Sequence, residues 1–238
     1  MTDNARDGNG NGIVLDTAQN TTSQIAHLVA NNVTSVLRYL DPLSTSAAKV
    51  IKPAEAQALA SAGIKLALVS EGWGSFAHGA ISAMAGERDA QNALSAVPLL
   101  GVASGATIYF AVDTDAGLVQ IEKLVLPYFA SITSAFAASG LSVGVYGSGN
   151  VCDLVIANGL AARAWLAGAQ RWGGTRAYLA ARPPELVLVQ HVPSRLANMD
   201  VDVNDVLGDF GDFLPFAPAP MSASSEASPA PATETPNV

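Results

Sequence analysis

The chain has 238 residues, of which half are apolar and only 13% are charged, a composition typical of a folded domain with a substantial buried core. Its net charge of −8 would repel nucleic acid and anionic lipid headgroups, so we exclude both as partners. The single cysteine, Cys152, excludes an intrachain disulfide, and no His/Cys spacing indicates a zinc site, so we expect no metal and no cofactor.

In chain order, short apolar runs alternate with helical patterns. The runs and patterns predict strand Ile13–Asp16, helix Ser23–Asn31, strand Ser35–Leu40, helix Lys52–Ala62, strand Ile64–Glu71, helix His78–Val97 interrupted near Gly86, strand Thr107–Asp113, helix Leu118–Ala138 kinked at Pro127, strand Ser142–Tyr146, helix Asn150–Asn158, and strands Ala164–Leu166, Leu186–Gln190 and Val201–Val203.

The two ends of the sequence are predicted to lie outside the folded domain. Residues 1–12 are rich in Gly, Asn and Asp, and residues 215–238 in Pro, Ala, Ser and Thr, which favours disordered tails on a domain that spans 13–214. The first residues lack the apolar core of a signal peptide, and no stretch has the roughly 18 apolar residues that span a bilayer. We expect a soluble chain without a visible export signal, so secretion or attachment to the cell wall would need another route.

The cores of the predicted strands are continuous apolar runs, which is typical of parallel strands covered on both faces. A barrel and an open doubly wound sheet would both account for such strands. About eight strands in about 200 residues favour a (β/α)₈ TIM-type barrel in which some helices are short or missing. The glycine pattern at 144–149 does not match a nucleotide-binding loop in the first strand-to-helix turn.

Polar side chains follow the predicted strands. In a parallel barrel every strand end faces the same rim, and that rim carries the active site. An Asp at a strand end is also a common helix cap, which stays an alternative for Asp16 and Asp115. The residues at or just beyond strand ends are Asp16, Glu71, Asp113, Asp115 and Asp202, and Gln190 ends a further strand.

Asp113 and Asp115 lie two residues apart in a strand-like stretch, so their side chains are expected on the same side. Neighbouring carboxylates split their pKa values, which leaves one protonated and one ionised. Glycoside hydrolysis needs such a pair. His191, which follows Gln190, is predicted to point away from the cavity. The aromatic residues near the strand ends that are predicted to stack on sugar rings are Trp73, Phe76, Tyr109, Tyr146 and Trp165, of which Trp73 and Trp165 are equally well explained as core residues.

Several segments occur in the order found in one known family. They include Leu15-Asp16-Thr17, Val36–Leu40, Ile108–Asp115, Val143–Gly149, Ala164–Ala167, Val189-Gln190 and Val201–Asn204. Over roughly residues 13–210 the sequence resembles a bacterial and fungal glycoside-hydrolase-like family, catalogued as a domain of unknown function and typified by a secreted mycobacterial protein. That family is in turn similar to the Chalaropsis-type lysozymes, which are muramidases with an incomplete (β/α) barrel.

The resemblance implies a site directed at peptidoglycan or a related polysaccharide. Asp16 matches the Asp that ends the first strand in the muramidase pattern, and Asp202-Val-Asn204 matches a late Asp-x-Asn. The central Asp-x-Glu is replaced by Asp113-Thr-Asp115, so an Asp occupies the position of the proposed general acid. The shorter side chain withdraws the carboxyl by about 1.3–1.5 Å. A misplacement of about 1 Å can cost about two orders of magnitude in rate.

Two main hypotheses follow. The first is a muramidase-like glycosidase in which Asp115 or Glu71 donates the proton, Asp113 stabilises the developing charge, and Asp16 and Asp202 complete an acidic floor. The second is a glycan-binding, cell-wall-associated barrel that is catalytically weak or silent, which the Asp at position 115 favours. A third option is a hydrolase that holds a divalent cation on the acidic rim. The substrate-binding candidates are Gln190, Tyr146, Trp165, Trp73, Tyr109 and Arg38.

Overall fold

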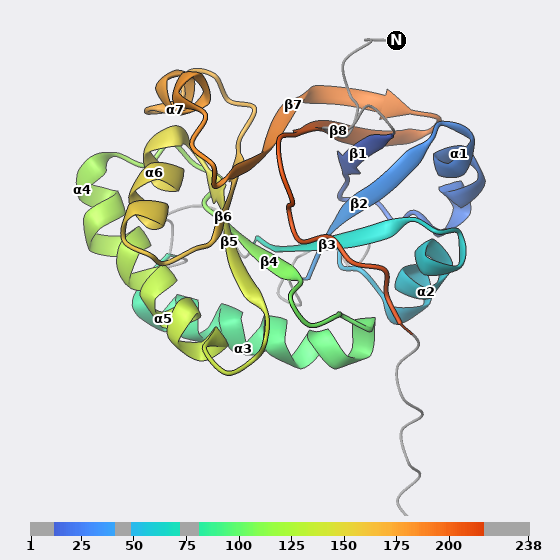
Figure 1. The fold of residues 1–238 in the computed structure, drawn as a ribbon, viewed down its shortest axis with the longest axis horizontal. Helices are drawn as coiled ribbons and strands as arrows, with labels where there is room; N and C mark the ends of the chain where they lie inside the picture. Colours follow the sequence, from blue (N-terminus) through green and yellow to red (C-terminus); the bar gives the residue numbers. More distant parts are fainter. Residues whose placement is uncertain (1–11, 41–48, 72–80, 217–238) are drawn as a thin grey trace, which may run out of the picture.

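A computed structural model describes residues 12–40, 49–71 and 81–216. Within these residues, eight strands close a barrel in sequence order (Figure 1). This confirms the predicted TIM-type barrel. The strands are β1 (Ile13–Asp16), β2 (Val33–Tyr39), β3 (Lys65–Ser70), β4 (Thr107–Ala111), β5 (Ser142–Gly147), β6 (Arg163–Leu166), β7 (Leu186–Leu196) and β8 (Met199–Val206).

The last strand reverses direction. Strands β1 to β7 pair in parallel, whereas β8 is antiparallel to both β7 and β1. A tight turn at Ala197, whose φ is +52°, joins β7 directly to β8 in place of a helix. The first half of β8 therefore meets the ends of the other strands. Asp202 reaches the rim from this first half, and not as a strand end as the sequence predicted.

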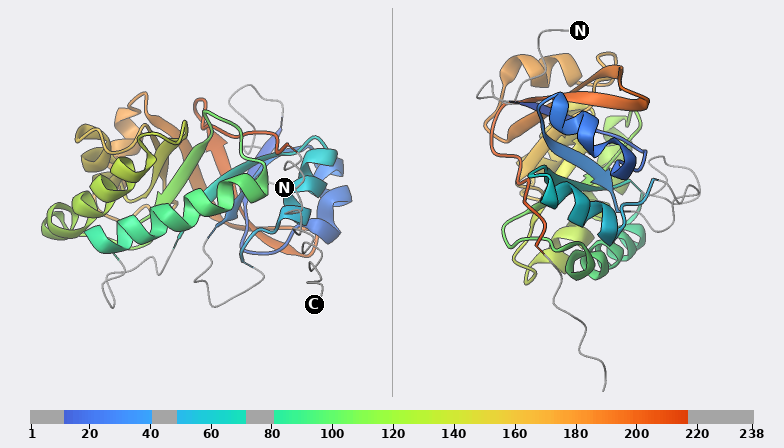
Figure 2. Two further views of the ribbon diagram at one scale, coloured as in Figure 1. Left: turned by 90° about the horizontal axis from the view of Figure 1, so that it is seen from below. Right: turned by 90° about the vertical axis from the view of Figure 1, so that its right-hand side faces the viewer.

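Helices cover the outside of the barrel. Figure 1 shows α1 and α2 on one side and α3 to α7 along the other, and Figure 2 shows α3 extending along the barrel. In the described ranges no helix is long and apolar enough to cross a membrane. The helices are α1 (Ile25–Ala30) after the 3₁₀ turn η1 (Thr22–Gln24), α2 (Pro53–Ser61), α3 (Ala83–Leu100), α4 (Leu118–Gln120), the π-helical turn η3 (Ile121–Val125), α5 (Leu126–Phe136), α6 (Gly149–Ala157) and α7 (Thr175–Ala181).

Two local expectations for the long helices are corrected. Gly86 does not interrupt α3, because its missing side chain lets the helix pack directly on α5: a Cβ there would lie 2.2 Å from the carbonyl oxygen of Tyr128. Pro127 sits in the first turn of α5, and the distortion that it was expected to cause is the π-helical turn η3 just before it. Ser82 caps α3 by accepting a hydrogen bond from the amide of Ala85.

Strand residues alternate between two apolar cores. One set faces outward and packs under the helices, and the other fills the barrel. At the end opposite the rim, Phe210 closes the barrel, where its carbonyl oxygen accepts a hydrogen bond of 2.9 Å from the Tyr109 hydroxyl. The chain remains bonded to the body as far as Phe216, whose amide donates to the carbonyl of Gly101 at 3.1 Å. On each strand, the side chains that face the barrel interior therefore continue up to the rim.

Candidate active site

A cavity of about 500 Å³ opens at the rim where β1 to β7 end. Its position follows from the two-residue alternation of the strands: Tyr39 continues the inward face of Leu37, and Asp113 continues that of Ala111. The residues that line it are Tyr39, Lys49, Val69, Glu71, Ala111, Asp113, Tyr146, Trp165, Gly168, Ala169, Trp172, Gln190, His191, Pro193 and Asp202.

Asp16 lies beneath this cavity and is almost completely buried, with 2% of its surface exposed. The Asn204 side-chain amide donates to one of its carboxylate oxygens at 2.9 Å. The oxygen of Asn204 in turn accepts a hydrogen bond of 2.7 Å from the indole nitrogen of Trp165. This chain of bonds fixes the orientation of the Asn204 amide and directs its nitrogen at the Asp16 carboxylate.

Gln190 links the two acidic residues of β1 and β8. Its amide nitrogen lies 3.2 Å from an oxygen of Asp16 and 3.3 Å from an oxygen of Asp202. Its oxygen accepts a hydrogen bond of 2.8 Å from the Tyr146 hydroxyl. The register agrees with this arrangement, because Asp16 is directly opposite Asp202 in the antiparallel β1–β8 pair. One glutamine side chain therefore holds two carboxylates and a tyrosine in place.

Burial raises the pKa of these acids. For Asp16 the pKa is raised to about 7, chiefly because burial disfavours the charge; the hydrogen bond from Asn204 opposes the rise and the charge of Asp202 adds to it. Burial also raises the pKa of Asp113, against the opposing effects of Lys49 and of the Tyr146 hydroxyl. The pKa of Asp202 is raised first by burial and then by the charge of Asp113. Burial raises the pKa of Tyr146 far above neutrality, so its hydroxyl remains a hydrogen-bond donor.

Glu71 is ion-paired. Its carboxylate lies 2.7 Å from the ammonium nitrogen of Lys49, which also sits 4.3 Å from the centre of the Tyr39 ring. The Lys49 ammonium is the counter-charge of the Glu71 carboxylate. This pairing disfavours Glu71 as the proton donor that the sequence analysis suggested.

Asp115 does not line the cavity, which corrects the expectation that it lies beside Asp113. Strand β4 ends at Ala111 and the chain bends at Thr114, so the two-residue alternation does not continue to position 115. The Asp115 carboxylate instead accepts a hydrogen bond of 2.7 Å from the backbone amide of Gly173. Asp115 is exposed to solvent, and this hydrogen bond links it to the loop between β6 and α7.

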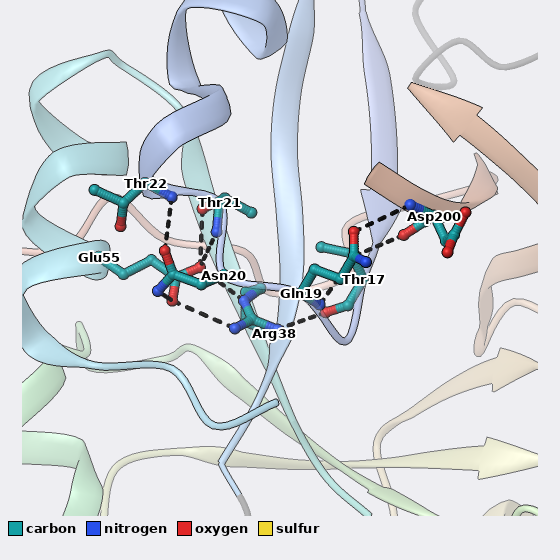
Figure 3. Close-up of polar contacts among 8 residues, drawn as sticks. All are labelled: Thr17, Gln19, Asn20, Thr21, Thr22, Arg38, Glu55 and Asp200. Atoms are coloured by element: carbon teal, nitrogen blue, oxygen red, sulfur yellow. Dashed lines mark hydrogen bonds and ion pairs between the residues drawn. The ribbon is translucent and has the colours of Figure 1, made fainter. Parts of the chain in front are cut away.

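Arg38 also lies away from the cavity, because it faces outward on β2 (Figure 3). It is fully buried, forms an ion pair of 2.8 Å with Glu55 of α2, and donates a hydrogen bond of 2.6 Å to the carbonyl of Thr17. The amide and hydroxyl of Thr21 donate to the same Glu55 oxygen at 2.9 and 2.8 Å. Arg38 therefore anchors the segment that follows Asp16 and does not contact a ligand in the cavity.

The other aromatic candidates fall into three groups. Tyr146 and Trp165 line the cavity as expected. Tyr109 faces the barrel interior but lies too deep: it is fully buried, with its ring packed edge-on at 5.8 Å from that of Trp165. Trp73 and Phe76 lie outside the described residues.

Sequence reasoning missed several cavity residues. Tyr39 was detectable, because it continues the inward face of a predicted strand. Lys49 and Trp172 come from segments without periodic patterns and left no such signal. His191 was expected to point away, yet it contributes to the cavity edge, although its imidazole nitrogen lies 2.8 Å from the Asp205 carboxylate. Among the described residues, no group of three or more His, Cys, Asp or Glu side chains is arranged to hold a metal ion.

A TIM-type barrel with acidic and aromatic side chains at the carboxyl ends of its strands has the architecture of the glycoside hydrolase-like proteins. The chain belongs to the Rv2525c-like, glycoside hydrolase-like domain family, whose family model matches residues 26–205. This agrees with the resemblance found in the sequence.

Known proteins extend the comparison. The chain is 46% identical over 74 residues to the uncharacterized protein YbfG of Bacillus subtilis, a match that covers 28% of this chain and only 10% of YbfG. The crystal structure of the Tat-secreted protein Rv2525c of Mycobacterium tuberculosis in complex with HEPES is similar with a TM-score of 0.72 and 23% identity, covering 84% of this chain and 98% of that one. The modular autolysin LytC of Streptococcus pneumoniae, solved with a synthetic peptidoglycan ligand, is similar with a TM-score of 0.52 and 14% identity, covering 81% of this chain and 46% of LytC.

Proposed function

We propose that the cavity binds a polysaccharide of the peptidoglycan class and hydrolyses its glycosidic bonds. The observation that carries this proposal is the presence in one open cavity of three carboxylates together with aromatic rings. Carboxylates supply the acid and the anionic group of glycoside hydrolysis, and aromatic rings pack on the apolar faces of sugars. The likeness of the fold to an autolysin solved with a peptidoglycan ligand supports this substrate class.

Asp113 is the proton donor in this proposal. It is exposed to the cavity, its pKa is raised by burial, and it carries no ion pair as close as that of Glu71 with Lys49. Because the charge of Asp113 raises the pKa of Asp202, protonation of Asp113 leaves Asp202 free to ionise. Asp202 then stabilises the positive charge that develops on the sugar, while the Gln190 amide holds its carboxylate in position. A water molecule attacks the anomeric carbon and gives its proton to the ionised Asp113, which restores the acid.

A second candidate function is glycan binding without hydrolysis. Asp115 is occupied by the Gly173 amide and Glu71 by Lys49, so two of the carboxylates predicted for catalysis are committed elsewhere. Binding needs the cavity and its aromatic walls but no free acid. One experiment separates the two candidates.

The test measures the release of reducing ends from purified peptidoglycan and, in parallel, sedimentation of the protein with that polymer. We expect wild type to release reducing ends and the Asp113→Asn variant to lose about a hundredfold of that rate while still sedimenting. The control is Asp153→Asn, on the exposed side of α6, which leaves both readouts unchanged. Sedimentation without release by wild type supports the second candidate, and the absence of both refutes the two together.

A further inference from the structure

Trp172 is the cavity aromatic residue with the most available ring. It lies in the loop between β6 and α7, lines the cavity and is only partly buried against the barrel interior. Trp165 is 2% exposed and its indole nitrogen is bonded to Asn204, and Tyr146 is also buried. Tyr39 has the Lys49 ammonium 4.3 Å from its ring centre. Among the described residues, Trp172 is therefore the best placed to present a ring face to a ligand.

The two peptide groups that flank Gly173, the residue after Trp172, are each held by a hydrogen bond. The Gly173 amide donates to the Asp115 carboxylate at 2.7 Å, and the Gly173 carbonyl accepts from the Asn150 amide at 2.9 Å. Asp115 follows β4 and Asn150 lies in the first turn of α6, so the loop is tied to two separate elements. The bond to the Asp115 carboxylate is charge-assisted, which makes it stronger than a hydrogen bond between neutral groups.

Two glycines allow the loop backbone to lie in direct contact with the start of α6. Gly174 has φ of +73°, and a Cβ at that position would lie 2.1 Å from the side-chain oxygen of Asn150. A Cβ on Gly149 would lie 2.3 Å from the carbonyl carbon of Gly174. The loop backbone thus rests directly on the start of α6, where a side chain at either position would displace it. The position of the neighbouring Trp172 is set by this contact.

From these contacts we infer that Trp172 is the residue that stacks on a pyranose ring in the cavity, and that Asp115 is a positioning residue that fixes its loop through the Gly173 amide. The ligand class follows from the ring: an indole face packs on the C–H-bearing face of a sugar and so selects glycans with equatorial substituents. This inference rests on the proposed function for its ligand. It also gives Asp115 a role that involves no proton transfer.

The binding test is calorimetric titration with the β-1,4-linked tetramer of N-acetylglucosamine. We expect Trp172→Ala to weaken binding about tenfold and Asp115→Ala to weaken it by a smaller factor. Asp115→Asn keeps an oxygen that accepts the Gly173 bond and is expected to bind like wild type. Because Asp115 acts through Trp172, the double variant with both alanines binds no more weakly than Trp172→Ala alone. Wild-type affinity in Asp115→Ala, or additive losses in the double variant, would overturn the inference.

A measurement without ligand separates this inference from the proposed function. We expect the amide hydrogen exchange of Gly173, followed by NMR, to be about tenfold faster in Asp115→Ala than in wild type, and to return towards the wild-type rate in Asp115→Asn. The same spectra report whether each variant is folded. If wild type fails to bind the tetramer, the proposed function and the stacking role of Trp172 fail, and the Gly173 rate alone decides the role of Asp115. Unchanged exchange in Asp115→Ala refutes that role.

Discussion

Replacing Asp16 by Asn should change the pH dependence of stability. The folded protein holds this carboxyl with a pKa of about 7 against an ordinary value of 3.8, because burial disfavours its charge. At pH values between 3.8 and about 7, the Asp16 carboxyl has lost its proton in the unfolded chain but keeps it in the folded chain. Stability therefore falls as pH rises through this window, and the loss is complete above the folded pKa. An asparagine has nearly the shape of the protonated acid and cannot ionise.

The size of the effect follows from the two pKa values. One pKa unit corresponds to about 1.4 kcal/mol, and most of the shift is traversed between pH 5 and pH 8. Wild type should lose about 2 to 3 kcal/mol of unfolding free energy across that range through Asp16 alone. Asp113 and Asp202 contribute in the same direction, but both remain in the variant and so largely cancel in the comparison.

Urea denaturation of both proteins at pH 5, 6, 7 and 8 measures this difference. We expect the unfolding free energy of Asp16→Asn, relative to wild type, to rise by about 2 to 3 kcal/mol from pH 5 to pH 8. A constant offset is expected as well, because the new amide replaces an oxygen that now accepts from Asn204 or Gln190. This constant offset does not change how the free-energy difference between the two proteins varies with pH. Parallel curves for the two proteins would refute the assignment of a raised pKa to Asp16.

Two further predictions concern stability and use urea denaturation. Glu55→Gln removes the negative charge of Glu55 from its buried ion pair with Arg38 and should cost about 3 kcal/mol; a loss below about 0.5 kcal/mol would contradict the importance of this pair. Gly174→Ala should cost roughly 2–3 kcal/mol, from its positive φ and from displacement of Asn150, whereas Gly159→Ala, with φ of +67° and no atom within 4 Å of the new Cβ, should cost about 1 kcal/mol. Equal losses for the two alanines would contradict the close packing of the loop.

The barrel was predictable because its signals are local. Continuous apolar runs indicate buried strands whatever their partners are, and the first six of the eight predicted strands alternate with five predicted helices. The missed helix α7 has seven residues and only a weak apolar pattern, and the outer half of the β7–β8 hairpin is interrupted by Pro193 and Arg195. Short or polar elements of this kind are stabilised by the rest of the fold and not by their own sequence.

The gathering of Asp16, Asp113 and Gln190 at one rim followed from the strand ends, since parallel strands place their carboxyl ends together. Alternation also decides which face a residue takes, but only where the strand continues. Asp115 lies beyond the bend at Thr114, and so its expected partnership with Asp113 failed.

By itself, then, the amino-acid sequence determined the parallel strands and the end at which polar side chains collect, and it favoured the barrel over an open sheet, because apolar periodicity and strand polarity are properties of neighbouring residues. Only the tertiary structure decided that β8 runs backwards, that Lys49 pairs with Glu71, and that Trp172 lines the cavity. The reversal of β8 combines the tight turn after β7 with pairing to β1, and the other two outcomes depend on contacts between residues far apart in the chain. Their geometry is set when the barrel closes, and no local pattern records it.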